Sequence, residues 1–339
     1  MKKTLVTGIS GQDAAYLSKK LLNEGHHVVG GLRRGAERTL WRLKSLDILN
    51  DIEIIDLELT ELSEILSIVS KYKFDYIYNL AAMSFVGTSF GQPISTANTN
   101  YIGALNILES IKSVNPDSRF YQASTSEMFG KVQEMPQKES TPFYPRSPYG
   151  VSKLAAHWAT INYRESYGLF SCSGILFNHE SPLRGSEFVT QKIVLGLNAI
   201  KNGLLDKVVL GNLNAKRDWG HADDYVSAMK LILENNVAED YVVATGNLFS
   251  VREFCELAAK YFDFEINWVG ESSQEKGIDK KSGKIIFEVS KEFYRPAEVD
   301  ILHGDPTLIE TKLGWKRKHT FESLVLDMCE NAKNYAALN

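Results

Sequence analysis

The sequence predicts an α/β protein built on a doubly wound parallel sheet, with a smaller mixed α/β lobe in the C-terminal half. Strand-like and helix-like stretches alternate through the first half of its 339 residues. The strand-like stretches are continuous apolar runs, which is typical of a parallel sheet covered on both faces. A turn that contains glycine follows the first of these runs directly, as in dinucleotide-binding folds.

The expected strands are residues 4–7, 27–32, 52–57, 74–81, 119–124 and 171–177. Helices are expected at residues 12–23, 62–72, 98–113 and 149–167. The first of these helices is predicted by the spacing of Tyr16, Leu17, Leu21 and Leu22, which places them on one face. Repeated strand–helix units of this kind form right-handed crossovers and a doubly wound sheet.

The regular alternation ends near residue 178. We therefore expect residues 1–178 to form mainly the sheet domain and residues 179–339 mainly the smaller lobe, with some segments returning to the sheet. Helices are expected at residues 190–202, 250–262 and 320–335. Residues 179–185 are predicted as a loop, and the polar, Gly/Ser/Lys-rich residues 270–284 as a mobile surface loop.

Composition excludes several classes of protein. With 38 Lys and Arg against 42 Asp and Glu, the net charge is −4, so nucleic acid is not expected as a partner. The three cysteines, Cys172, Cys255 and Cys329, are too scattered for a disulfide framework or a zinc site, and no metal is expected. No apolar run approaches the length of a membrane span, and the first residues show no secretory pattern. A cytoplasmic protein is expected.

The turn after the first strand has the pattern G-x-x-G-x-x-A, formed by Gly8, Gly11 and Ala14. Glycines let the backbone approach a diphosphate, and the following helix N-terminus supplies N–H groups. Such glycines can also serve only to make a turn, but their place between first strand and first helix favours an NAD(P)-binding Rossmann fold. The candidate cofactor residues in this segment are Gly8, Ser10, Gly11, Gln12 and Asp13.

The end of the second strand distinguishes NADP from NAD. An acidic residue there would bind the ribose hydroxyl of NAD, whereas this chain has Arg33 and Arg34. Guanidinium groups suit a 2′-phosphate, so NADP is the expected cofactor; the alternative is a solvated basic pair. Other strand ends add candidate cofactor residues: Asp56 and Leu57 beside the adenine, then Leu80, Ala81, Ala82 and Ser84.

The predicted chemistry depends on Thr125, which follows the fifth strand, and on Tyr149 and Lys153, which begin the next helix. A Tyr and a Lys four residues apart lie on one face of a helix. The ammonium group can favour the phenolate and make the tyrosine a base near neutral pH. With the threonine as hydrogen-bond partner, these groups can oxidise an alcohol with a nicotinamide cofactor. An ordinary surface Tyr–Lys pair is the alternative.

Glu127 indicates more than alcohol oxidation. Once a hydroxyl-bearing carbon becomes a ketone, the neighbouring C–H is acidic, and a carboxylate two residues beyond Thr125 could remove its proton. A hydroxyl one carbon further could then leave, and the reduced cofactor could return its hydride. The result is dehydration without net redox change. Alternatively, Glu127 caps the following turn or is solvated.

These residues lie in strings that resemble the GDP-mannose 4,6-dehydratases, a family of the extended short-chain dehydrogenase/reductases. The resemblance covers nearly the whole chain. It is densest at residues 120–127, 141–150, 174–182 and 215–220, and a fifth string occupies residues 294–300. In one departure, this chain has Ala14 where many relatives have glycine.

The resemblance implies a catalytic sequence for the five residues. Thr125 and Tyr149 bind the sugar O4, Tyr149 takes its proton, and the C4 hydride goes to NADP⁺. Lys153 holds the nicotinamide ribose and supports Tyr149. Glu127 takes the C5 proton, Ser126 assists with Glu127 in losing the C6 hydroxyl as water, and NADPH reduces C6. The implied product is GDP-4-keto-6-deoxy-D-mannose.

The resemblance also implies His179 and Arg184 as cofactor-side residues. The implied nucleotide-sugar residues are Ser84, Glu127, Asn178, Lys192, Arg217, Arg295 and Glu298. The cations in this set suit a diphosphate in a chain that is acidic overall. Without the resemblance they would be interpreted as solvated surface charges.

Three alternatives to GDP-mannose dehydration stay open. GDP-D-glycero-D-manno-heptose could undergo the same reaction, because the sequence does not show the room near C6. A nucleotide-sugar reductase or epimerase would not need Glu127. A non-catalytic binding protein would not need Thr125, Tyr149 and Lys153 together.

A homo-oligomer, dimer or tetramer, is also expected. In relatives, the basic stretch that corresponds to residues 33–42 meets a neighbouring subunit near the cofactor, giving tetramers. Leu40 and Trp41, two large apolar residues in that stretch, favour a contact role. The alternative is that both fold back on their own subunit.

Overall fold

A parallel sheet forms the centre of the larger part of the molecule. The computed structural model describes residues 1–293 and 301–338. Within them, a seven-stranded sheet has the order β11-β6-β5-β4-β1-β2-β3, and each of its pairings is parallel. The doubly wound fold is therefore confirmed. The strands are β1 (Lys3–Thr7), β2 (His27–Leu32), β3 (Glu53–Asp56), β4 (Tyr76–Asn79), β5 (Arg119–Thr125), β6 (Ser171–Leu176) and β11 (Tyr241–Val243).

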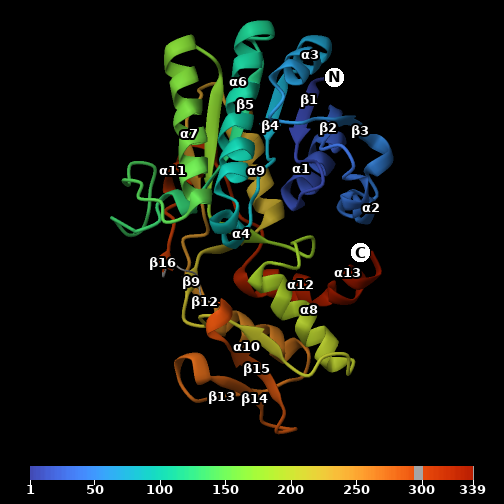
Figure 1. Cartoon of the computed structure of the whole chain (residues 1–339), viewed down its shortest axis with the longest axis vertical. Helices are drawn as coiled ribbons and strands as arrows, with labels where there is room; N and C mark the ends of the chain where they lie inside the picture. Colours follow the sequence, from blue (N-terminus) through green and yellow to red (C-terminus); the bar gives the residue numbers. More distant parts are fainter. Residues whose placement is uncertain (294–300, 339) are drawn as a thin grey trace.

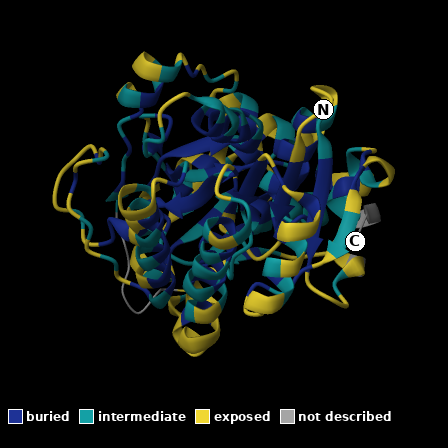
Figure 2. Cartoon of the chain, turned by 90° about the horizontal axis from the view of Figure 1, so that it is seen from above, coloured by how far each residue is buried: buried dark blue, intermediate teal, exposed yellow. Residues whose placement is uncertain are grey.

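Helices cover both faces of this sheet (Figure 1). Successive strand residues point to opposite faces, so Leu5 packs in the cluster with α3 (Leu62–Tyr72) and α6 (Gly103–Val114). Its neighbour Val6 packs in the cluster with α1 (Gln12–Asn23) and α9 (Ala222–Glu234). The central strands of the sheet are dark blue in Figure 2, whereas outward-facing parts of the helices are exposed. The long helix α7 (Pro148–Tyr167) covers the same face as α6.

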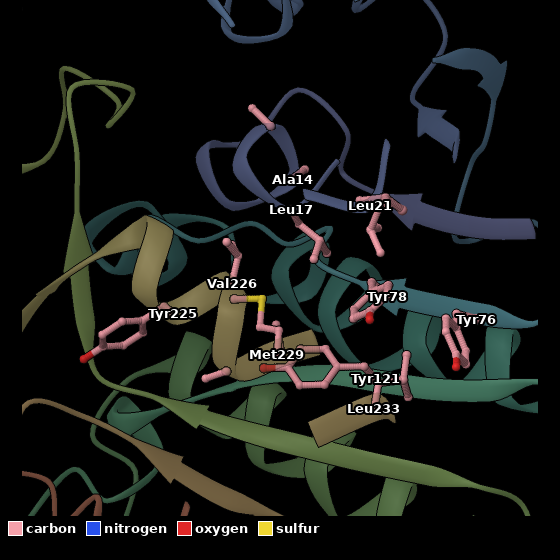
Figure 3. Close-up of a cluster of buried hydrophobic side chains, with 14 of the residues drawn as sticks. Ala14, Leu17, Leu21, Tyr76, Tyr78, Tyr121, Tyr225, Val226, Met229 and Leu233 are labelled. Atoms are coloured by element: carbon pink, nitrogen blue, oxygen red, sulfur yellow. The ribbon is translucent and has the colours of Figure 1, made fainter. Parts of the chain in front are cut away.

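The cluster between α1 and α9 joins distant parts of the sequence (Figure 3). Leu17 of α1 and Met229 of α9 lie near the rings of Tyr78 and Tyr121 from the sheet. Those two rings are 5.8 Å apart between centroids. The second half of the chain thus supplies a covering helix and the edge strand β11 to the larger sheet.

The smaller part of the molecule has its own core and lies below the sheet in Figure 1. Its strands form a mixed sheet of order β13-β14-β15-β8 among the described residues. Helix α10 begins with a capping box in which Ser250 and Glu253 satisfy each other's backbone N–H. The elements are α8 (Val189–Lys201), α10 (Val251–Tyr261), α12 (Phe321–Glu330), α13 (Ala332–Leu338), β8 (Val208–Leu210), β13 (Ile266–Val269), β14 (Lys276–Asp279) and β15 (Ile285–Val289).

Short elements connect the two parts. β7 (Asn178–Glu180) pairs with β10 (Trp219–His221), and β9 (Lys216–Arg217) lies between β12 (Phe249–Ser250) and β16 (Ile301–Leu302). The remaining helices are α2 (Trp41–Ser45), α4 (Val86–Gly91), α5 (Pro93–Ala97) and α11 (Thr307–Leu313). A turn of π-helix, Asn98–Ile102, joins α5 to α6.

Two predicted loops are wrong in part. Residues 270–284 were expected as a mobile loop, but β14 is an interior strand there. The half-buried Lys276 and Ile278 alternate with the buried Gly277 and Asp279. The Asp279 carboxylate accepts hydrogen bonds from Ser282, so a polar composition is compatible with a strand. Residues 179–185 begin in β7 instead of a loop, because parallel pairing with β10 extends the chain.

Two predicted helices also differ. The helix at 320–335 is two helices, α12 and α13. The helix expected at 98–113 begins five residues earlier, at Pro93, and passes through the π turn.

In the stretch after β2, residues 33–42, Leu40 and Trp41 were expected to contact a partner subunit. Both residues pack against their own chain. Leu40 is buried in the core that contains α1, and the ring of Trp41 meets that of Tyr335 at 5.0 Å. The structure therefore favours the fold-back alternative for Leu40 and Trp41. No helix among the described residues is long and apolar enough to cross a membrane.

Candidate active site

A cavity of about 660 Å³ opens at the carboxyl ends of the parallel strands and continues to the smaller lobe. It brings together most of the predicted site residues. From the larger part these are Gly8, Gly11, Gln12, Asp13, Leu80, Ala82, Ser84, Thr125, Ser126, Glu127, Tyr149 and Lys153. From the segments after β6 they are Asn178, His179, Arg184, Lys192 and Arg217.

Six predicted cofactor residues do not line this cavity. Arg33, Arg34 and Asp56 are exposed at the ends of β2 and β3. Ser10, Leu57 and Ala81 lie behind the lining residues, where they pack or hydrogen-bond to neighbouring loops. Arg295 and Glu298, predicted to bind the nucleotide sugar, lie outside the described residues.

The glycine turn is held close to the loop after β4. Gly8 has a positive φ of 65°, and a Cβ atom there would lie 2.7 Å from the Cα of Ala81. Only glycine fits both requirements. The Thr7 hydroxyl accepts hydrogen bonds from the N–H groups of Leu80 and Ala81, both at 3.1 Å. This cradle, followed by the N-terminus of α1, fits the diphosphate of a dinucleotide.

The start of α7 is fixed by capping and by close packing. The Ser147 hydroxyl accepts a hydrogen bond from the N–H of Gly150 at 3.0 Å, and Pro148 occupies the first helical turn. A Cβ atom on Gly150 would lie 2.8 Å from the carbonyl oxygen of Glu127. The helix can therefore begin directly against the segment after β5, which places Tyr149 and Thr125 in one cavity.

The electrostatics of Tyr149 and Lys153 differ from the sequence expectation. Burial raises the pKa of Tyr149 to about 12, although a hydrogen bond with Thr125 and the charge of Arg184 oppose the rise. Burial lowers the pKa of Lys153 to about 8. The Lys153 ammonium donates to the carbonyl oxygen of Ala123 at 2.9 Å. Desolvation thus disfavours the charged forms of both side chains.

Asn100 connects two sides of the site and was missed by the sequence analysis. Its side-chain amide donates to the Ser152 hydroxyl at 3.0 Å and accepts from the N–H of Met83 at 2.9 Å. It is buried in the π turn, a feature that often marks functional positions but has no clear sequence pattern. The lining rings of Phe85, Phe188 and Phe293 were also missed.

Two cations, one from helix α8 and one from strand β9, lie at the smaller-lobe end of the cavity. Lys192 is on α8, and its ammonium is 3.7 Å from the ring centre of Phe293. Burial lowers its pKa. Arg217 of β9 is buried and donates to the carbonyl oxygen of Lys216 at 2.9 Å. Together with Asn178 of β7, these groups can bind an anionic ligand.

The fold and the strand-end site define a Rossmann enzyme of the extended short-chain dehydrogenase/reductase type. The family model described as GDP-mannose 4,6 dehydratase matches residues 5–328. The chain belongs to this family.

Curated relatives support membership of this family, and the similarity extends over nearly their full length. The chain is 45% identical to GDP-mannose 4,6 dehydratase of Dictyostelium discoideum, covering 96% of this chain and 94% of the relative. It is 46% identical to that of Homo sapiens, covering 96% and 89%. It is 44% identical to GDP-mannose 4,6-dehydratase of Vibrio cholerae, over 99% of this chain and 96% of the relative.

Solved structures show the fold. A dTDP-glucose 4,6-dehydratase from Bacillus anthracis in complex with NAD superimposes with a TM-score of 0.82 at 21% identity, covering 100% of this chain and 98% of the other. RMD from Pseudomonas aeruginosa, complexed with NADPH, superimposes with a TM-score of 0.77 at 21% identity. The match covers 98% of this chain and 100% of the other.

Proposed function

We propose that this protein dehydrates GDP-mannose to GDP-4-keto-6-deoxy-D-mannose with NADP as cofactor. One observation carries the proposal: Ser126 and Glu127 share a cavity with Thr125, Tyr149 and Lys153 in a chain of the GDP-mannose 4,6-dehydratase family. Alcohol oxidation needs only the last three residues. The additional carboxylate supports a dehydratase over a reductase or epimerase.

In the proposed mechanism, Thr125 forms a hydrogen bond with the sugar O4. Tyr149, in its phenolate form, takes the proton of the O4 hydroxyl. Burial opposes this phenolate by raising the pKa of Tyr149, whereas the Thr125 hydrogen bond and the charge of Arg184 favour it. Glu127 removes the C5 proton, and Ser126 with Glu127 protonates the C6 hydroxyl, which leaves as water. NADP would supply the hydride acceptor for C4 and, when reduced, the donor for C6. The proton that Tyr149 took from O4 would then pass to C5, which restores the phenolate.

The proposal assigns the two ends of the cavity to different ligands. Gly8, Gly11 and their neighbours in the turn would hold the cofactor diphosphate, and Arg33 with Arg34 the 2′-phosphate. Lys153, His179 and Arg184 would lie on the cofactor side. The sugar nucleotide would lie at the other end, where the proposed residues are Ser84, Asn178, Lys192, Arg217, Arg295 and Glu298.

The proposal also covers the roles of the two halves of the chain, the oligomeric state and the cellular location. Residues 1–178 would mainly bind the cofactor and residues 179–339 mainly the nucleotide sugar, with α9 and β11 packing in the larger part. We also propose a homodimer or homotetramer in the cytoplasm, as the likeness to the family implies.

Product analysis with two substrates tests the reaction and its specificity. Purified protein receives GDP-mannose or GDP-D-glycero-D-manno-heptose, each deuterated at C4, and products are analysed by mass and NMR. We expect loss of one water from GDP-mannose, transfer of deuterium from C4 to C6, and the faster rate with this substrate. Faster turnover of the heptose would reassign the substrate. A product without deuterium at C6 would contradict the mechanism.

A further inference from the structure

The two ring nitrogens of His179 both face hydrogen-bond acceptors. Nδ1 lies 2.7 Å from the carbonyl oxygen of Phe177, and Nε2 lies 2.8 Å from a carboxylate oxygen of Asp13. A carbonyl oxygen and an ionised carboxylate only accept hydrogen bonds. The interaction with His179 lowers the pKa of Asp13, and with Asp13 ionised both ring nitrogens carry protons. The geometry therefore fits an imidazolium paired with a carboxylate.

Asp13 lies where an anionic ligand would be repelled. It is in the first turn of α1, two residues after Gly11, and it lines the cavity. Within residues 1–293 and 301–338, its carboxylate accepts hydrogen bonds from the Gln12 side chain at 3.1 Å and from His179 at 2.8 Å. A helix N-terminus favours one negative charge, so an uncompensated carboxylate there competes with the diphosphate of a cofactor.

The pair is held rigidly between α1 and β7. The side chain of Gln12 donates to the carbonyl oxygen of His179 at 3.2 Å and accepts from the Ser181 hydroxyl at 2.7 Å. The His179 ring stacks on Tyr225 of α9 with centroids 4.5 Å apart. His179 is buried and Asp13 is half-buried, so water reaches this contact only from the cavity side of Asp13.

We propose that His179 is a positioning residue for cofactor binding: its imidazolium cancels the Asp13 carboxylate, so that the turn at Gly8–Gly11 accepts a diphosphate. The inference rests on the proposed binding of a dinucleotide in this cavity. In this proposal the His179 side chain neutralises Asp13 and does not itself contact the cofactor.

The surrounding charges define the pH dependence. The charge of Arg184 lowers the pKa of Asp13, and the Asp13 charge raises the pKa values of Arg42 and Lys153 against the effect of burial. The Asp13 charge also raises the pKa values of Tyr121 and Tyr149, which burial already raises, and the ring of Tyr225 stacks on His179. Burial alone would lower the pKa of His179, but Asp13 reverses this and raises it. The compensating charge therefore persists to higher pH than the charge of a free imidazole, and it is lost as pH rises through that raised pKa.

A double-mutant cycle tests the proposal by binding alone. His179→Gln, Asp13→Asn and the double variant are titrated with NADP⁺ and, separately, NAD⁺ by calorimetry between pH 5 and 9. At pH 8 we expect His179→Gln to weaken both cofactors about 10-fold or more, because the carboxylate is unpaired. In this variant the loss should shrink at low pH, because burial without the imidazolium raises the pKa of Asp13 and favours its neutral form. Asp13→Asn and the double variant should bind within about 3-fold of the wild type.

Additive losses in the double variant would overturn charge compensation, as would unchanged affinity in His179→Gln. The protonation state is measured independently by NMR of ¹⁵N-labelled histidine. We expect two protonated ring nitrogens at pH 8 in the wild type, and a neutral His179 ring in Asp13→Asn. A neutral ring in the wild type at pH 7 would overturn the proposal even if a His179 variant failed to fold. Since no turnover is measured, failure of the proposed dehydration would leave these results interpretable.

Discussion

The two ends of the cavity are built in different ways. At the strand-end side, Thr125 ends a central strand and Tyr149 begins a 20-residue helix that packs against it. At the smaller-lobe side, Lys192 projects from α8 and Arg217 from the two-residue strand β9. The first set is fixed by backbone hydrogen bonds and close packing, whereas the second depends on long side chains.

This difference separates chemistry from ligand recognition. Proton transfer requires groups within hydrogen-bond reach, which a rigid sheet and helix can provide. A diphosphate can be bound by cations from several segments, because charge attraction tolerates small changes in distance. We therefore expect variants at the first end to reduce kcat and variants at the second end to raise KM.

Tyr149→Phe should have the largest effect. Removing the proposed base should lower kcat by about 1,000-fold, with little change in nucleotide-sugar binding, because the ring and its packing remain. Steady-state kinetics and calorimetry measure the two quantities. Tyr163→Phe is the matched control on the same helix, since its hydroxyl bonds Glu109 away from the cavity. Near-normal turnover of Tyr149→Phe would remove the tyrosine from the mechanism.

Glu127→Gln should lower overall turnover by about 100-fold or more and leave the first step intact. C4 oxidation should still occur, but elimination should stall, so enzyme-bound NADPH should accumulate. Absorbance at the reduced-nicotinamide band in a single turnover measures this. Glu165→Gln, on the exposed side of α7, should behave as wild type. If product forms without NADPH accumulation, Glu127 has another role.

Lys192→Ala should test the smaller-lobe end. Loss of a cation from the proposed diphosphate site should raise the KM for GDP-mannose about 10-fold, with kcat changed much less. Lys201→Ala is the control on the same helix, where Lys201 pairs with Asp263 at 2.8 Å outside the cavity. A loss confined to kcat would show that this end of the cavity also organises the chemistry.

Arg33→Ala should have the smallest effect on catalysis, because this exposed residue lies outside the cavity. NADP⁺ affinity should fall about 10-fold through the lost charge-assisted bond to the 2′-phosphate, and NAD⁺ affinity should stay the same. Titration with both cofactors measures the difference. Lys44→Ala, in the neighbouring helix α2, controls for the general loss of a positive charge. Equal losses for both cofactors would mean that Arg33 has a structural role.

The fold could be predicted mainly where strands are buried on both faces. The runs around Leu5, Ile77 and Phe120 are apolar throughout and were recognised as strands. Helix α9 was missed, although Val226, Met229 and Leu233 have helical spacing. It follows a segment with no regular pattern, and its partner α1 lies some 200 residues away in the chain. Strand β14 was missed because half of its residues are polar.

The site was predictable where a local pattern carries the chemistry. The glycine turn, Thr125 and the Tyr149–Lys153 spacing are all local, and the structure brings them into one cavity. Asn100 was not predictable, because its role depends on a π turn and on contacts with Met83 and Ser152. The pKa of Tyr149 could not be predicted from a local sequence pattern either, because it depends on how deeply the folded chain buries the phenol.

The sequence by itself determined the doubly wound sheet, the family and the residues able to do the chemistry, because apolar periodicity, glycine turns and short motifs act over a few residues. Only the tertiary structure decided which of them meet. It joined Asp13 to His179 across 166 residues, placed Lys192 and Arg217 at one end of the cavity, and left Arg33 outside it. Long-range contacts of this kind depend on the packing of whole elements, which no local pattern contains.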